Sequence, residues 1–145
     1  VYLKQNRLNL ALSHIGKAID KAPLAARADE VKYHRMRAVI LRRMNRPGEA
    51  LQTLEENLIE SERRAFDVVR EMALCFSARG RFREAAIVYE SALKDDPADP
   101  RLHEGAAHAW IKAGEPSKAS LNLDRIRALE RERPVLAELE KLLDR

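Results

Sequence analysis

Residues 66–99 read FDVVREMALCFSARGRFREAAIVYESALKDDPAD, and residues 100–133 read PRLHEGAAHAWIKAGEPSKASLNLDRIRALERER. Laid over one another, the two stretches place Ala85 on Ala119, Gly80 on Gly114 and Phe76 on Trp110, a step of 34 residues. Glycine and proline fall between the apolar runs, as they do between helices. The chain is therefore expected to consist of helical repeats.

The first stretch carries an ordered set of small, aromatic, glycine and proline residues: Ala73, Phe76, Gly80, Phe82, Ala85, Tyr89, Ala92 and Pro97. This order resembles the signature of the tetratricopeptide repeat (TPR) family. In such a repeat the small residues let two helix backbones approach, the aromatic residues fill the space between helix pairs, and the glycine suits the tight turn. The resemblance implies an all-α, right-handed α-solenoid of antiparallel helix pairs.

Weaker copies extend the resemblance over nearly the whole chain. An upstream copy keeps Ala38, Leu41 and Ala50 but has Asn45 where the later copies have glycine. We divide the 145 residues into one domain with a partial repeat (1–30), three repeats (31–65, 66–99 and 100–133) and a capping helix (134–145). The incomplete first repeat predicts that this sequence was excised from a longer protein.

Turn and cap residues predict eight helices at about 7–21, 26–44, 48–60, 64–79, 83–95, 101–113, 117–130 and 135–144. Four prolines are expected at first helical positions, where the missing N–H costs nothing: Pro47, Pro100, Pro116 and Pro134. Asp99 is expected to cap the helix that Pro100 opens. Tyr2 is expected near the end of an earlier helix. One extra residue between Ala50 and Ala85 is expected in the turn near Ser61.

The sequence predicts no catalytic, metal or cofactor site, and hence a non-enzymatic protein. His103 and His108 are five residues apart, whereas the zinc-protease motif needs histidines four apart on one helical face. His103 is instead expected to pack inward. The five glycines are spread along the chain, so no phosphate-binding loop is present. The single cysteine, Cys75, lies in an apolar run and is expected to be a buried thiol.

Positive charge is concentrated in the first half. Residues 1–65 contain 13 Lys/Arg and 8 Asp/Glu, a net of +5, whereas residues 66–145 contain 14 and 15, a net of −1. Residues 31–47 hold six basic residues and no acidic one: Lys32, Arg35, Arg37, Arg42, Arg43 and Arg46. Such a run either attracts an acidic partner or keeps an exposed helix soluble.

The resemblance also implies where a ligand would bind. In TPR proteins the first helix of each pair lines a concave groove, mainly through its second, fifth, ninth, twelfth and thirteenth residues. Carried over by position, these include Val39, Leu74 and Ser77, together with the basic residues that we assign to a ligand groove: Lys32, Arg35, Arg42, Arg43, Arg70, Arg101, His108 and Lys112. Arginine can grip a carboxylate through two parallel hydrogen bonds.

The function that follows is a protein-interaction scaffold or adaptor whose groove binds a peptide or protein segment of acidic character. Two alternatives remain: a polyanion binder, for nucleic acid or an acidic polysaccharide, using the 31–47 face, and a regulatory or targeting arm of a larger enzyme. Nucleic acid is the less favoured partner, since Tyr33 is the one aromatic residue in that face.

Apolar edges at Tyr2 and Leu3 would allow self-association. No apolar run approaches the ~20 residues that span a bilayer. The high Ala and Arg content points weakly to a bacterial source, and a cytoplasmic location is slightly favoured.

Overall fold

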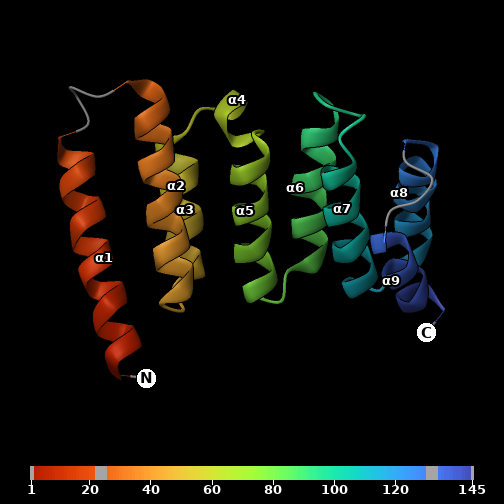
Figure 1. Ribbon diagram of the computed structural model, residues 1–145, viewed down its shortest axis with the longest axis horizontal. Helices are drawn as coiled ribbons and strands as arrows, with labels where there is room; N and C mark the ends of the chain where they lie inside the picture. The colour runs from red at the N-terminus through yellow and green to blue at the C-terminus, as the bar shows by residue number, and fades with distance from the viewer. Residues whose placement is uncertain (1, 22–25, 130–133, 145) are drawn as a thin grey trace.

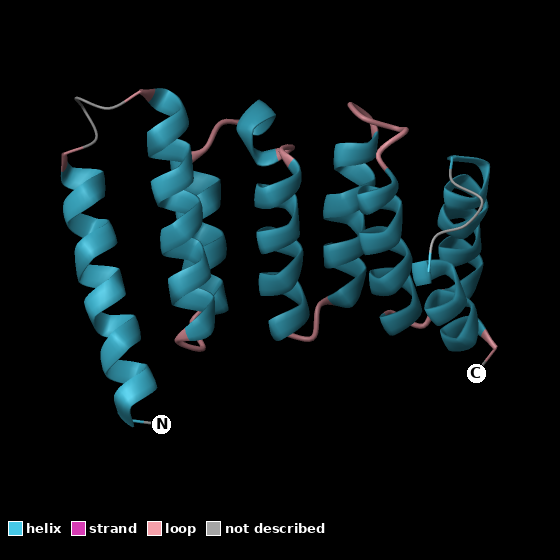
Figure 2. Cartoon of the chain, in the orientation of Figure 1, coloured by secondary structure: helices cyan, strands magenta, loops and turns pink. Residues whose placement is uncertain are grey.

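The computed structural model describes residues 2–21, 26–129 and 134–144, and every regular element in them is a helix (Figures 1 and 2). The helices are α1 (Tyr2–Asp20), α2 (Arg27–Arg43), α3 (Pro47–Asn57), α4 (Glu60–Arg63), α5 (Phe66–Ala78), α6 (Phe82–Leu93), α7 (Pro100–Lys112), α8 (Pro116–Leu129) and α9 (Pro134–Leu143). They stand side by side in chain order, with the two termini at opposite ends of the molecule (Figure 1). The fold is an all-α solenoid of helix pairs.

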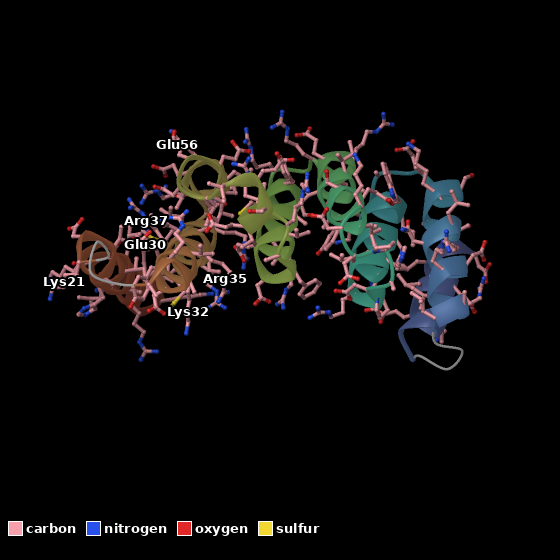
Figure 3. The ribbon with its side chains drawn as sticks, turned by 90° about the horizontal axis from the view of Figure 1, so that it is seen from above. Lys21, Glu30, Lys32, Arg35, Arg37 and Glu56 are labelled. Atoms are coloured by element: carbon pink, nitrogen blue, oxygen red, sulfur yellow. The ribbon has the colours of Figure 1, made fainter. Side chains whose placement is uncertain are left out.

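Two rows of helices make up the middle of the solenoid. Seen from above, α2, α5 and α7 lie on one side, and α3 and α6 lie on the other (Figure 3). The helices α2, α5 and α7 also contact one another in succession. We call the surface of these three helices that faces away from α3 and α6 the inner wall.

The turns that join the two helices of a pair are built alike. In each turn a backbone N–H donates to the carbonyl oxygen of the residue five positions earlier, at 2.9 Å: Arg46 to Leu41, Arg81 to Phe76, and Glu115 to Trp110. The preceding residue has a positive φ in all three turns: 61° at Asn45, 72° at Gly80 and 78° at Gly114. Glycine and asparagine tolerate this backbone conformation best. The predicted equivalence of Phe76 and Trp110 is confirmed.

Fully buried alanines mark the closest contacts between helices. Ala38, Ala50, Ala85, Ala107 and Ala119 have no exposed surface. Larger apolar side chains fill the remaining volume, chiefly Leu54, Leu123, Ile126 and Leu139. Phe76 packs against two of the three apolar clusters and so joins neighbouring pairs. The core is therefore a continuous strip along the stack rather than one central cluster.

The predicted helix starts are confirmed at all four prolines, which are the first residues of α3, α7, α8 and α9. Asp99 caps α7 as predicted, because its carboxylate accepts a hydrogen bond from the backbone N–H of Arg101 at 2.9 Å. Hydrogen bonds from the Arg101 side chain hold the pKa of Asp99 below its usual value. At the far end, α9 contacts α7 and α8 and buries Leu139 completely.

The structure departs from the predicted helices in two places. The expected helix 48–60 ends at Asn57, and a separate one-turn helix, α4, follows it. The Glu62 carboxylate stabilises this turn by accepting from the N–H of Ile59 at 3.0 Å. The prediction that Tyr2 closes an earlier helix is wrong, because α1 runs without a break from Tyr2 to Asp20. The side chains of Tyr2 and Leu3 lie outside the described part of the structure.

A buried ion pair links α2 to α5. The Arg42 Nε atom donates to Glu71 Oε1 at 2.5 Å, and Nη2 lies 3.4 Å from Oε2. The Glu71 side chain is 6% exposed and that of Arg42 is 24% exposed. The hydrogen bond to Glu71 also raises the pKa of Arg42. This contact fixes how the first helices of two adjacent pairs meet.

Removing Arg42 should lower the unfolding free energy more than neutralising Glu71 does. Arg42→Ala leaves a buried carboxylate without its cation and should cost about 3 kcal/mol of unfolding free energy. Glu71→Gln keeps an acceptor and should cost only about 1–2 kcal/mol, because the freed guanidinium can reach water. Arg43→Ala, at the exposed neighbour of Arg42, serves as a control and should change stability by less than about 0.5 kcal/mol. Urea unfolding measures all three; a larger cost for Glu71→Gln than for Arg42→Ala would contradict this account.

Gly105 should resist replacement although it lies within a helix. A Cβ atom at Gly105 would come 2.3 Å from Cζ of Tyr89, inside van der Waals contact. Alanine favours a helix by about 1 kcal/mol over glycine, but overpacking of this kind costs about 1–3 kcal/mol, so Gly105→Ala should lower the unfolding free energy. At Gly16 in α1 a Cβ would meet nothing within 4 Å, so Gly16→Ala should stabilise the protein. Chemical denaturation gives the unfolding free energy of both variants, and equal changes in the two would contradict this prediction.

Candidate functional site

The residues that the sequence assigns to a ligand groove lie on α2, α5 and α7, and the structure gives them different surroundings. Lys32 and Arg35 lie on the side of α2 that faces away from α3 (Figure 3). Arg70 on α5 and Lys112 on α7 are exposed. Within the described residues none of these four side chains forms an ion pair. They are therefore available to a partner.

Three other predicted groove residues are engaged elsewhere. Arg42 is held by Glu71 in the ion pair described above. The guanidinium of Arg101 lies 4.1 Å from the centroid of the Phe66 ring and 2.9 Å from Asp99 Oδ2. Arg43 lines a hollow with Lys4 and Leu8 at the α1 side of α2. Arg42 and Arg101 thus each have a partner within the protein, and their assignment to a ligand groove stays a prediction.

The hollow of the inner wall lies between α5 and α7. We call it the α5–α7 groove; it has a volume of about 260 Å³ and is lined by Ala73, Leu74, Ser77, Ala85, Tyr89, Gly105, His108, Ala109 and Lys112. Small side chains dominate the lining, and they create the space. Leu74 is 37% exposed, so it offers an apolar contact to an entering segment. The predicted residues His108 and Lys112 are brought together here.

Tyr89 forms the floor of this groove, where Gly105 admits its ring at close range. Burial raises the pKa of the Tyr89 hydroxyl, and the charge of Arg70 acts in the opposite direction. Arg70 therefore lies within electrostatic reach of the groove. A positive side chain beside a half-buried hydroxyl is an arrangement that can hold a carboxylate.

The basic run 31–47 does not form a single charged face. Arg37 points to the opposite side of α2 from Lys32 and Arg35 (Figure 3). Arg46 pairs with Glu49, and Arg42 pairs with Glu71. Five of the six cations are thus spread around α2, Arg46 lies in the turn after it, and ion pairs neutralise two of the six. An extended polyanion would find only part of this charge on any one side.

His103, Cys75 and His34 are fully or partly buried among the helices. His103 is buried as predicted, and its Nε2 atom lies 2.8 Å from the carbonyl oxygen of Pro97. Cys75 is fully buried, and desolvation raises the pKa of its thiol to about 12. The ring of His34 is partly buried, which lowers its pKa. In the described ranges, no three His, Cys, Asp or Glu side chains gather in a way that would hold a metal ion.

A second and larger hollow was not predicted. It lies along α8, with a volume of about 790 Å³, and its lining includes Glu90, Trp110 and Asn122. A signal for it exists in the aligned repeats. At the 34-residue step, His103 and Asn122 replace Val69 and Val88. Polar residues at apolar repeat positions indicate a local specialisation.

Two family models match the chain, and both are described as tetratricopeptide repeat. One matches residues 35–100 and the other matches residues 76–143. A search of curated proteins finds no match. Within the described ranges no helix is both long and apolar enough to cross a membrane. The two matches together extend over residues 35–143, the same part of the chain in which the three alike turns and the buried alanines recur. The chain belongs to the tetratricopeptide-repeat family.

Proposed function

We propose that this protein is a binding scaffold that holds an acidic segment of a partner protein along its inner wall. Tetratricopeptide repeats generally mediate protein–protein interactions, and such scaffolds are typically non-catalytic. The observation that carries the proposal is the α5–α7 groove with the exposed Leu74 in its lining. Lys32, Arg35, Arg70 and Lys112 lie along the same wall.

The acidic character follows from which cations are already neutralised. Arg42 and Arg101 are paired with carboxylates of the protein itself. Lys32, Arg35 and Arg70 are not paired within the described residues. Lys112 lies 5.7 Å from the Phe82 ring centroid, a contact that leaves its charge uncompensated. A segment with carboxylates on either side of one apolar residue would match this wall, with the apolar side chain against Leu74.

Reversing three of the four unpaired charges should weaken the binding of an acidic peptide. The probe is fluorescein-labelled Glu-Glu-Leu-Glu-Glu with blocked ends, measured by fluorescence polarisation at low and moderate salt. Changing Arg35, Arg70 and Lys112 to Glu should weaken binding at least tenfold, a loss of about 1.4 kcal/mol. Three exposed lysines away from the wall provide the matched control: Lys17, Lys94 and Lys141 changed to Glu alter the net charge from +4 by the same six units.

The control separates local recognition from general attraction. Equal loss in both triple variants would show that only net charge matters, and the proposed wall would be wrong. The sequence Lys-Lys-Leu-Lys-Lys should not bind. A short single-stranded oligonucleotide that binds more tightly than the acidic peptide would favour the polyanion alternative and contradict the proposal. Circular dichroism of each variant confirms that the helices are intact.

A further inference from the structure

The large hollow along α8 has features of a built binding site. We call it the α6–α8 groove and define it by Glu90 on α6, Trp110 on α7, and Lys118, Leu121, Asn122 and Arg125 on α8. It is about three times larger than the α5–α7 groove, at about 790 against 260 Å³. Leu121 is 68% exposed and forms an apolar side of the opening.

A buried polar network forms the deep end of this groove. The Glu90 Oε1 atom accepts from Trp110 Nε1 at 3.1 Å and from Asn122 Nδ2 at 3.3 Å. Asn122 Nδ2 also lies 3.3 Å from His103 Nδ1. Since Pro97 offers only a carbonyl oxygen, His103 Nε2 donates to it, and Nδ1 is left to accept from Asn122 Nδ2. Three donor atoms and three acceptor atoms are thus satisfied without any cation.

This network leaves one buried acceptor without a partner and one negative charge without a cation. Glu90 is half-buried, and within the described residues it forms no ion pair with a lysine, arginine or histidine. Asn122 is 4% exposed, and its Oδ1 atom is buried without a hydrogen-bond partner. A buried acceptor without a partner is unfavourable, because it has lost its hydrogen bonds to water. The charge of the Glu90 carboxylate is not compensated, because both of its hydrogen-bond donors are neutral groups.

We propose that the α6–α8 groove binds an arginine side chain presented by a protein partner. Glu90 supplies the negative charge, and Asn122 Oδ1 supplies the second acceptor. The planar guanidinium has five N–H donors, so it can bridge acceptors on two residues, which an ammonium group does less well. Leu121 would contact the aliphatic part of the arginine. No residue lines both grooves, so this site does not depend on the acidic-segment site.

Lys118 is the natural competitor for this position. Its ammonium lies 4.4 Å from the centroid of the Trp110 ring and 3.3 Å from Glu115 Oε1. It therefore covers the indole face that a second cation would otherwise contact. Because the Lys118 side chain is 51% exposed, it can move away when a partner enters.

Trp110 is the single tryptophan of the chain and reports on the groove directly. The tripeptide Ala-Arg-Ala with blocked ends should change its fluorescence in a saturable way, with a dissociation constant of the order of 1 mM at low salt. Ala-Lys-Ala should bind several-fold more weakly. The peptide in which citrulline replaces arginine has the same shape without the charge, and it should give no saturable change in the fluorescence of Trp110. Ala-Glu-Ala should not bind either.

Two substitutions test the named residues. Glu90→Gln keeps an oxygen acceptor for Trp110 and Asn122 but removes the charge, so it should weaken Ala-Arg-Ala binding about tenfold. Lys118→Met should strengthen binding several-fold, because the competing cation is gone. Glu84→Gln is the control, since Glu84 lies on the same helix, pairs with Arg81 and does not line the groove. It should leave the affinity unchanged.

The proposal is overturned if citrulline and arginine peptides bind alike, or if the arginine peptide gives no saturable signal. Unchanged affinity in folded Glu90→Gln or Lys118→Met would also contradict it. If Glu90→Gln loses its helical circular dichroism, the comparison of arginine with citrulline on the unaltered protein still decides. The acidic pentapeptide used for the inner wall should bind without altering these titrations.

Discussion

The structure depends on the close approach of helix backbones at positions that only a small side chain can occupy. Ala38, Ala50, Ala85, Ala107 and Ala119 are completely buried at these contacts. A larger residue at any of them would push two helices apart, and the displacement would pass to the next pair because the pairs touch in series. The same requirement extends to Gly105, where the neighbouring ring leaves no room even for a methyl group.

Much of the fold could be predicted from the sequence because its determinants are local. Proline at a helix start, aspartate at a cap, and glycine or asparagine at a left-handed turn act within one turn of the chain. The step between equivalent residues then gives the number of helix pairs. The short helix α4 was missed because no apolar pattern marks it. It is stabilised instead by a side-chain contact, in which the Glu62 carboxylate accepts from the N–H of Ile59. The boundaries assigned to the single repeats stay predictions.

The candidate sites were less predictable, since they depend on contacts between distant residues. Family positions identify which residues lie on the inner wall, and His108 and Lys112 do meet there. The sequence could not show that Arg42 is used by Glu71, because that pairing depends on how α2 and α5 are aligned in space. The α6–α8 groove was missed for a different reason. Its polar residues are scattered over three helices, and each one alone resembles an ordinary surface residue.

Because α1 rests mainly on α2, whereas α7 is in contact with α5, α6, α8 and α9, the helices differ in how many neighbours hold them. In a linear array, local opening is governed by the number of interfaces that must be broken. Backbone amides of α1 can therefore exchange with solvent by a local event that leaves the rest of the array intact. Those of α7 should be protected by a far larger part of the molecule, and α7 contributes residues to both proposed binding grooves.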